Sequence, residues 1–326
     1  MSDLKRRILE AVADDLEEIE KELLKNLNPH LDLVREVAGH ILFSGGKRLR
    51  PLLMVLSAKV CDYAGTYDKT FSTAFEYLHA ATLLHDDLVD GASLRRGKPV
   101  AHRVWGNSIA VLVGDFLLAR ALAITAGTER IAVVRILAEL TEAMSQGEVH
   151  QLMRKGDIGL SEDEYLEVIR RKTALLFQAA CRVSAVLADA PAERQSALAD
   201  YGFNLGMAFQ VVDDLLDYVA ETPQLGKATG ADLREGKLTL PLIHALRSAR
   251  SADRKWIAGV VRKMDVTDED FRKLVELLKA CGALRYTEKV AALYIEKAKA
   301  ALADFPPSAA LETMRDIADY TLERKV

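Results

Sequence analysis

The feature that most constrains the fold is the recurrence of apolar residues every three to four positions along almost the whole chain. The first such stripe consists of Ile8, Val12, Leu16, Ile19 and Leu23. This spacing places apolar side chains on one face of an α-helix, whereas a half-buried strand needs strict alternation over four to eight residues. No segment longer than a few residues alternates in that way. We therefore expect an all-α chain.

The same period predicts a bundle of ten or more helices. They are expected over residues 8–26, 31–42, from Pro51 onward, and then over about 69–90, 107–126, 129–154, 161–188, 192–221, 237–249, 253–263, 267–280, 282–304 and 308–323. Ser161 with Glu164 matches a capping box, and Thr267 with Asp270 is a weaker version of it.

Composition excludes several classes of protein. Half of the 326 residues are hydrophobic, so a sizeable core is available, and no Pro-, Gly- or Ser-rich linker divides the chain. We therefore expect one domain over residues 1–326. The net charge of -4 gives no reason to expect nucleic acid. Cys61, Cys181 and Cys281 lie far apart without CxxC spacing, so we interpret them as small buried residues in a reducing, cytoplasmic environment.

The N-terminus leads into a charged amphipathic run, and not into an apolar signal segment. The most apolar window, residues 109–126, contains Asp115 and Arg120. Charged residues are rare inside membrane spans, so we expect a buried helix here and no stable membrane anchor.

Two aspartate clusters with the same DDxxD spacing lie more than a hundred residues apart, each surrounded by apolar residues. A single cluster can be a solvated helix face, but half-buried carboxylates need compensation, and two matching clusters are hard to explain as surface decoration. Facing each other across a cavity, they would hold hard cations that recruit phosphate. Mg²⁺ suits such a site better than Ca²⁺, because it binds one or two carboxylates and keeps water and phosphate oxygens. The expected ligands are Asp86, Asp87, Asp90, Asp213, Asp214 and Asp217.

Basic residues accompany these clusters in the expected breaks between helices. Gly45–Pro51 is a glycine-flexible turn with three cations at the start of a helix, where the helix dipole favours anions. Arg95-Arg96 follows the first cluster, and Lys227 and Lys237 follow the second. Each is weak evidence alone, but metal-binding acids together with bases at the loops indicate diphosphate sites, two in number.

These motifs resemble those of the trans-type isoprenyl diphosphate synthases, particularly the long-chain polyprenyl group. The resemblance runs from about residue 30 to 250 and more loosely to the C-terminus. It is carried by GGKRLRP, LLHDDLVD with RRGKP, GDFLLARA, QGEVHQL, KTA, GMAFQVVDDLLDY and LGK…DLREGK. It implies an all-α isoprenoid synthase fold around a central active-site cavity, a homodimer, and three Mg²⁺ ions with substrate bound.

The resemblance also implies roles for individual residues. The six aspartates would hold Mg²⁺ against an allylic diphosphate, which Arg95, Lys172, Lys227 and Lys237 would contact. Gly46, Lys47, Arg50, His79 and Arg96 would bind isopentenyl diphosphate. Lys172, Thr173 and Gln210 are the expected catalytic residues, with Thr173 and Gln210 beside the developing allylic cation. A lone His on an apolar helix is more often a core residue, so the assignment of His79 as a substrate contact depends on the resemblance.

The length of the product would depend on the helix before Asp86, along which a growing prenyl tail would run. Ala81 and Thr82 are small, whereas short-chain relatives tend to carry an aromatic residue there. The path would continue past Leu78 toward Phe75, which lies about 16 Å before Asp86 along a helix. We therefore expect an all-trans product of about C30 to C50, near C40. The floor of the path is left open between Phe75 and the 129–154 helix, with Leu137, Leu140 and Met144 as candidates.

Three alternatives remain. A geranylgeranyl or farnesyl diphosphate synthase would stop at a shorter product. A terpene cyclase would lack the second DDxxD cluster and the cations at Lys47 and Arg50. A non-catalytic partner subunit would have lost one aspartate cluster, whereas this chain has both.

Overall fold

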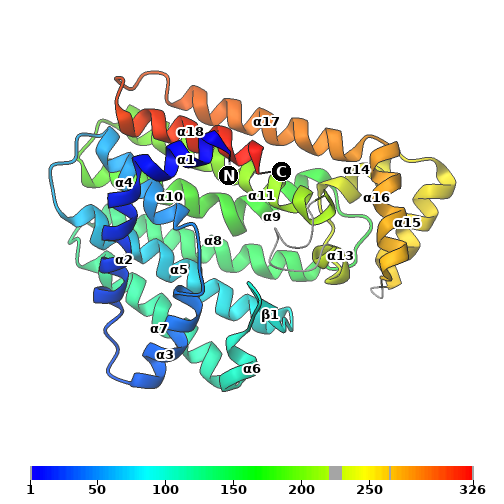
Figure 1. Ribbon diagram of the computed structural model, residues 1–326, viewed down its shortest axis with the longest axis horizontal. Coiled ribbons are helices and arrows are strands. Elements are labelled where there is room, and N and C mark those ends of the chain that lie inside the picture. The colour runs from blue at the N-terminus through cyan, green and yellow to red at the C-terminus, as the bar shows by residue number, and fades with distance from the viewer. Residues whose placement is uncertain (1, 220–229, 264–265, 325–326) are drawn as a thin grey trace. The chain divides into compact units, whose positions relative to one another are not determined.

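The computed structural model describes residues 2–219, 230–263 and 266–324, and these residues are almost wholly helical (Figure 1). The all-α prediction is confirmed. The chain divides into two compact units. Unit 1 comprises Met1–Glu139, Leu176–Gly202 and Ala301–Ile317, and unit 2 comprises Leu140–Leu175, Phe203–Ala300 and Ala318–Val326.

The helices begin and end close to where the apolar period predicts. The first are α1 (Asp3–Ala11), α2 (Ala13–Leu27), α3 (Asp32–Leu42), α4 (Leu49–Val60), α5 (Tyr67–Val89), α6 (Ala101–Trp105), α7 (Asn107–Ala126) and α8 (Ile131–Met153). Then follow α9 (Glu162–Ile169), the π-helical turn η1 (Arg170–Ala174), α10 (Leu175–Leu187), α11 (Ala192–Val219) and α13 (Ala231–Arg234). The last are α14 (Leu240–Ser248), α15 (Ser251–Lys263), α16 (Asp268–Ala280), α17 (Ala283–Ala301) and α18 (Ala309–Glu323).

Unit 1 is built around α5, which packs against α2, α3, α4, α6 and α7. Its apolar residues are buried along most of its length, and Phe71 and Phe75 meet edge to face with ring centroids 5.7 Å apart. The buried hydroxyl of Tyr77 donates to the backbone oxygen of Leu23 at 2.6 Å, which fixes α5 against α2. The aspartate cluster at the C-terminal end of α5 therefore sits on a rigid element.

A short hairpin follows α5 in unit 1. Its strands are β1 (Leu94–Arg95) and β2 (Lys98–Pro99), which pair antiparallel with Arg95 opposite Lys98. The two turn residues, Arg96 and Gly97, both have positive φ, 52° and 77°. Positive φ at both positions is typical of a type I′ turn, whose twist matches that of a two-stranded ribbon. The sequence patterns do not predict this hairpin.

Unit 2 has its own core, made by α9, α11, α14, α15, α16 and α17. Helix α14 is in contact with α9, α15 and α16. Both expected capping boxes are present: Ser161 and Glu164 bond each other's backbone at the start of α9, and Thr267 and Asp270 do so at α16. These caps satisfy backbone N–H groups that a helix start leaves without partners.

Helix α7 is the one described helix long and apolar enough to cross a membrane by length and composition, with a mean hydropathy of 2.0. Only 39% of this apolar window is buried within the chain. The helix is therefore less buried than the sequence predicts. Leu112 and Leu122 are among its exposed apolar residues. A single such helix is weak evidence for a membrane span, because core helices of soluble proteins have the same composition.

Two local features differ from the predictions. The single helix expected over 8–26 is broken at Val12, where φ is -118° and ψ is 9°. Val12 stays buried, so the apolar stripe continues across the break and does not reveal it. The cysteine prediction holds for Cys61 and Cys181, which are buried, whereas Cys281 is half-buried.

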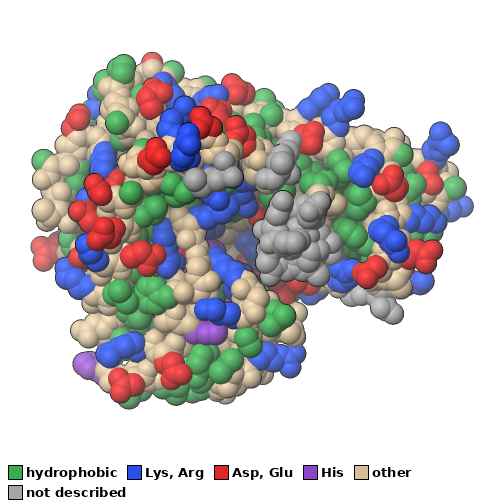
Figure 2. All heavy atoms as spheres, viewed as in Figure 1, with side chains coloured by type: hydrophobic (Ala, Val, Ile, Leu, Met, Phe, Trp, Pro, Cys, Tyr) green, Lys and Arg blue, Asp and Glu red, His purple; other side chains and the backbone are tan. Residues whose placement is uncertain are grey.

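The view in Figure 2 has charges of both signs distributed over the surface, with no large field of one sign.

Candidate active site

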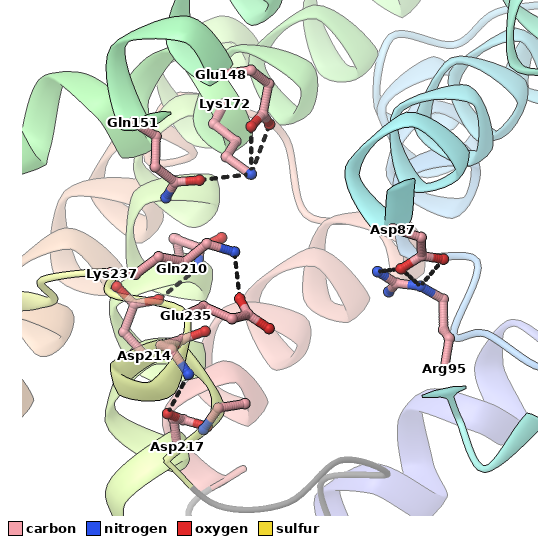
Figure 3. A network of polar contacts seen from close by, with 12 residues as sticks. Asp87, Arg95, Glu148, Gln151, Lys172, Gln210, Asp214, Asp217, Glu235 and Lys237 are labelled. Carbon is pink, nitrogen blue, oxygen red and sulfur yellow. Dashed lines mark hydrogen bonds and ion pairs between the residues drawn. The ribbon is translucent and has the colours of Figure 1, made fainter. Parts of the chain in front are cut away.

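The first group of site residues belongs to unit 1 and lies where α5 ends. Asp87 is buried, and its carboxylate accepts hydrogen bonds from Nε and Nη2 of Arg95 at 2.9 and 2.7 Å (Figure 3). The hairpin therefore brings Arg95 back onto the helix that precedes it. Asp86 and Asp90 lie beside Asp87 and are half-buried. The structure thus brings together Asp86, Asp87, Asp90 and Arg95 as the sequence predicts.

The GGKRLRP segment is fixed by an arginine that the sequence analysis did not assign. Arg48 is 6% exposed and adopts left-handed backbone geometry at the start of α4, with φ 47°. Its guanidinium donates to Glu20 at 2.5 Å, to Glu76 at 2.7 Å and to the backbone oxygen of Leu42 at 2.6 Å. A buried arginine with this many partners is an anchor, so Arg48 sets the path of the loop that carries Gly46 and Lys47.

His79 lies on α5, seven residues before Asp86, and is surrounded by cations. Burial, with Arg50, Arg95, Arg96 and Arg48 nearby, holds the pKa of His79 well below its usual value of 6.5. The imidazole is therefore neutral at pH 7. His79, Arg50 and Arg96 therefore lie near one another, and their binding of one ligand stays a prediction.

Arg96 completes the same group. Its guanidinium packs on Gly46, where an added Cβ would lie 3.4 Å from Nη1. Burial and the neighbouring Arg95 lower the pKa of Arg96 from its usual value. Arg50 lies over the Phe177 ring, 4.8 Å from its centroid. Like charges in one group repel one another, so a multiply charged anion bound here would stabilise these arginines.

The second group belongs to unit 2 and lines a pocket. Six predicted site residues contribute to its wall: Lys172, Thr173, Gln210, Asp213, Asp214 and Lys237. Lys237 donates to Glu235 at 2.7 Å. Apolar residues also line the pocket, with Leu160, Val168 and Leu238 among them. The pocket therefore combines acids, bases and an apolar surface, as a prenyl diphosphate would require.

Lys172 and Thr173 lie in η1, the π-helical turn between α9 and α10. Such turns are rare and occur frequently at functional sites. Gly147 of α8 packs directly on this turn: an added Cβ would lie 2.8 Å from Arg171 Cβ and 3.1 Å from the backbone nitrogen of Lys172. The absence of a side chain at Gly147 thus permits the close approach of α8 to η1.

Two further residues of α8 hold the Lys172 ammonium. Its Nζ donates to Glu148 at 2.7 Å and to Gln151 at 3.0 Å (Figure 3). The QGEVHQL motif therefore supplies both the contact surface for η1 and the partners of Lys172. Glu148 and Gln151 were not among the predicted site residues, although their i, i+3 spacing inside a recognised motif was an available signal.

Asp214 is held by two donors inside the pocket wall. Tyr165 donates to its Oδ2 and Gln210 Nε2 to its Oδ1, each at 2.7 Å. Burial, with Asp232 and Asp213 nearby, raises the pKa of Asp214 to about 8, although both hydrogen bonds lower it. Burial beside Asp214 also raises the pKa of Tyr165 well above its usual value. Burial and the neighbouring carboxylates therefore disfavour the charged form of Asp214 in this structure.

Asp217 differs from the other aspartates. It is fully buried, and its oxygens accept from the backbone nitrogens of Ala231 and Asp232 at 3.2 and 3.1 Å. In this structure the Asp217 carboxylate caps α13, and Asp232 lines the pocket instead. A metal-ligand role for Asp217 stays a prediction. Lys227 lies outside the described residues.

A residue near the end of α18 contacts Asp213. Arg324 Nη2 donates to Asp213 Oδ1 at 3.2 Å, and its guanidinium lies over the Phe209 ring at 4.4 Å. Arg324 was not among the predicted site residues, because no local pattern marks a long-range ion pair. The contact places a cation beside a predicted metal ligand.

The residues of the pocket fit a magnesium ion bound together with substrate. Within the described part of the chain, no group of three or more His, Cys, Asp and Glu side chains is placed to hold a metal by itself. Mg²⁺ is usually held through one or two carboxylates, with water and substrate phosphates as its other ligands. Asp213, Asp214 and Asp232 offer such donors, and the raised pKa of Asp214 reflects a charge that a cation would balance.

The predicted chain-length residues lie along α5. Phe75, Leu78 and Ala81 are buried, and Thr82 is half-buried with its hydroxyl bonded to the backbone oxygen of His79 at 2.8 Å. The other candidates for a floor, Leu137, Leu140 and Met144, are also buried. Their role in setting chain length stays a prediction.

Comparison with known proteins identifies relatives over nearly the whole chain. The model of the polyprenyl synthetase family matches residues 31–278. The octaprenyl diphosphate synthase of Escherichia coli (strain K12) is 38% identical over 318 residues, covering 98% of each chain. Component 2 of the heptaprenyl diphosphate synthase of Bacillus subtilis (strain 168) is 33% identical, over 96% of this chain and 88% of its own. The crystal structure of a Caulobacter crescentus polyprenyl synthase, complexed with calcium and isoprenyl diphosphate, is 41% identical, covers 98% of each chain and superposes with a TM-score of 0.94.

Proposed function

Because the chain belongs to the polyprenyl synthetase family, we propose that it joins isopentenyl diphosphate head-to-tail to an allylic diphosphate in a magnesium-dependent reaction. The reaction proceeds by ionisation, condensation and elimination. The product is a long-chain all-trans polyprenyl diphosphate of about C30 to C50, near C40. We assign this reaction to a single domain over residues 1–326, as the sequence predicts.

The observation that carries this proposal is the cationic group around His79. Arg50, Arg95, Arg96 and the anchored Arg48 lie near one neutral imidazole, so several cations gather at one place on unit 1. A diphosphate carries several negative charges and is matched by guanidinium groups that bind it through two hydrogen bonds at once. Gly46 and Lys47 would complete the isopentenyl diphosphate site from the adjoining loop.

The allylic substrate is bound at the other charged positions. Asp86, Asp87, Asp90, Asp213 and Asp214, with Asp217 as a sixth candidate, would hold three Mg²⁺ ions. When bound, these ions neutralise the charge that develops on the leaving diphosphate. Arg95, Lys172 and Lys237, with Lys227, contact the same diphosphate and add fixed positive charge.

Thr173 and Gln210 then face the allylic cation, while the apolar wall of the pocket keeps water from quenching it. No protein nucleophile is needed. The released diphosphate accepts the final proton. The protein's part in the chemistry is therefore orientation of the two substrates and stabilisation of charge.

The function is tested by a product assay. Purified protein is incubated with labelled isopentenyl diphosphate, farnesyl diphosphate and Mg²⁺, and the dephosphorylated alcohols are sized by chromatography. A ladder ending near C40 supports the long-chain proposal, an end at C15 or C20 supports the short-chain alternative, and no incorporation with any primer refutes the proposal. Chelation of Mg²⁺ should stop incorporation.

Two variants test the metal ligands in the same assay. Asp86→Ala and Asp213→Ala should each abolish incorporation while the helix content by circular dichroism stays unchanged. Asp304→Ala, which removes an exposed carboxylate on the surface, is the matched control and should retain full activity. An active Asp86→Ala or Asp213→Ala variant would contradict the assignment.

We also propose that the chain acts as a homodimer through α7. Its exposed stripe includes Leu112, Ala119, Leu122 and Ala123, apolar residues that a second copy would cover. Burying such a stripe removes apolar area from water at about 25 cal/mol per Å². The alternative is a different partner subunit, since one relative is named as component 2 of a heptaprenyl diphosphate synthase.

Light scattering during gel filtration distinguishes these states. Leu112→Glu should shift the protein to monomer, whereas Leu24→Glu on α2, with the same 62% exposure, should leave the dimer intact. A monomeric wild type without activity would favour a required partner subunit. The enzyme is expected to work in the cytoplasm, with brief membrane contact to release its apolar product.

A further inference from the structure

Four side chains of unit 2 form a continuous hydrogen-bond chain in the wall of the pocket. Thr173 Oγ1 donates to Gln210 Oε1 at 2.8 Å, and Gln210 Nε2 donates to Asp214 Oδ1 at 2.7 Å. The hydroxyl of Tyr165 donates to the other carboxylate oxygen, Oδ2, also at 2.7 Å. Thr173, Asp214 and Tyr165 are at most 5% exposed, so water competes little for these bonds.

The polarity of this chain is fixed from the Asp214 end. A carboxylate has only acceptor atoms, so the group of Gln210 that faces it must be the NH₂ and not the carbonyl. The Gln210 carbonyl then faces Thr173, whose hydroxyl must donate its hydrogen there. The acceptor lone pairs of the Thr173 oxygen are thereby left as the part that can face a substrate. This polarity applies to the metal-bound state of the proposed function, because a carboxyl group that binds a metal ion is ionised.

We propose that Tyr165 is a positioning residue for the condensation: through Asp214 and Gln210 it turns the Thr173 hydroxyl so that its oxygen lone pairs face the allylic cation. This inference rests on the proposed function. A hydroxyl with a free rotor would have to reorganise as positive charge develops, whereas one that is already oriented stabilises the cation at no such cost.

The setting of Tyr165 suits this role. It is the fourth residue of α9, and its backbone nitrogen donates to the Ser161 carbonyl oxygen at 3.0 Å, directly after the capping box that Ser161 and Glu164 form. Its ring is 3% exposed and packs in the core of unit 2. The phenol therefore approaches Asp214 on a rigid element with a fixed ring direction, which a flexible donor such as Lys would not provide.

A tyrosine elsewhere in the chain provides the matched control. Tyr201 lies on α11, the helix that carries Asp214, and is equally buried. Its hydroxyl donates to the backbone oxygen of Met314 at 2.8 Å and belongs to unit 1. Tyr165→Phe and Tyr201→Phe each remove one buried hydroxyl and its hydrogen bond, so they should lower Tm by similar amounts.

The two variants should differ in kinetics. Tyr165→Phe should lower kcat about tenfold with both KM values within about twofold of wild type, because the lost interaction is made only as the cation forms. Tyr201→Phe should keep the wild-type kcat. In a Thr173→Val background, Tyr165→Phe should lower kcat less than about twofold, since the two residues act through one chain of bonds. An unchanged kcat in Tyr165→Phe, or the same fold-loss in both backgrounds, overturns the proposal.

A second readout separates this inference from the proposed function. Crystal structures of wild type and Tyr165→Phe should differ in the Gln210 amide or in the Thr173 rotamer. Identical side-chain positions in both would overturn the inference whether or not the protein is active. A wild type that incorporates no isopentenyl diphosphate would refute the proposed function, and the crystallographic comparison would still decide the role of Tyr165.

Discussion

Gly147 and Gly259 are both helix residues, yet replacing them by alanine should have opposite effects. Alanine in a helix interior is favoured over glycine by about 1 kcal/mol, because glycine loses more backbone freedom on folding. At Gly259 in α15 an added Cβ meets nothing within 4 Å. Gly259→Ala should therefore raise the free energy of unfolding by about 0.5 to 1 kcal/mol.

At Gly147 the same Cβ meets the π-helical turn. Its distance of 2.8 Å to Arg171 Cβ is about 0.6 Å short of ordinary contact, and the backbone nitrogen of Lys172 lies at 3.1 Å. Helix α8 and η1 must separate locally, and overpacking of this kind costs about 1 to 3 kcal/mol. Since the propensity gain offsets about 1 kcal/mol, Gly147→Ala should lower the free energy of unfolding by up to about 2 kcal/mol.

The effect on activity should be larger than the effect on stability. The separation moves Lys172 away from Glu148 and out of its position toward the diphosphate, and a displacement near 1 Å costs up to about a hundredfold in rate. We expect kcat for Gly147→Ala to fall at least about tenfold and kcat for Gly259→Ala to stay unchanged. Urea unfolding and the labelled isopentenyl diphosphate assay measure both quantities. A Gly147→Ala variant as stable and active as Gly259→Ala would refute the close approach of α8 to η1.

Three further predictions follow from burial and charge. Because the pKa of His79 lies well below 6.5, the native state takes up a proton less readily than the unfolded chain, and stability should fall as the pH drops below about 6.5. The difference in Tm between wild type and His79→Gln should therefore shrink between pH 7 and 5.5. A constant difference in Tm would contradict the burial of a neutral imidazole. Arg48→Met removes the arginine that pairs with the buried Glu76 and should lower the free energy of unfolding, measured in urea, by about 3 to 5 kcal/mol. The control Arg35→Met changes an exposed arginine and should lower it by less than about 0.5 kcal/mol. Burial raises the pKa of Cys61 to about 11 and that of Cys181 to about 12. Iodoacetamide at pH 8 should therefore modify the half-buried Cys281 first, which peptide mass spectrometry measures. Early labelling of Cys181 would argue against its burial.

The helical fold was predictable because its signal is local. The apolar period gives α7 its bounds, and the capping pairs mark where α9 and α16 begin. The break at Val12 and the π-helical turn at Arg170–Ala174 were missed, because neither changes which residues are apolar. The hairpin after α5 was missed because its strands have only two residues each.

The types of residue in the candidate site were predictable from the sequence, but their contacts with one another were not. The repeated DDxxD spacing indicated Asp213 and Asp214, which line the pocket of unit 2. Spacing along one helix does not say that Asp217 would cap a segment fourteen residues later, or that Asp232 would line the pocket. Those assignments depend on contacts between distant parts of the chain, for which one sequence carries no local pattern.

Arg48 and Arg96 both hold left-handed backbone geometry, with φ of 47° and 52°, where Gly or Asn is the favoured residue. At Arg48 the buried ion pairs with Glu20 and Glu76 offset that backbone cost, so the residue contributes to folding. At Arg96 a stability-guided redesign that matched residue type to backbone would substitute Gly or Asn, and the turn would gain stability while one of the cations that gather around His79 would be lost. The trade-off between stability and activity is therefore located at one position of the hairpin, where a cation of the proposed diphosphate site adopts an unfavourable backbone conformation.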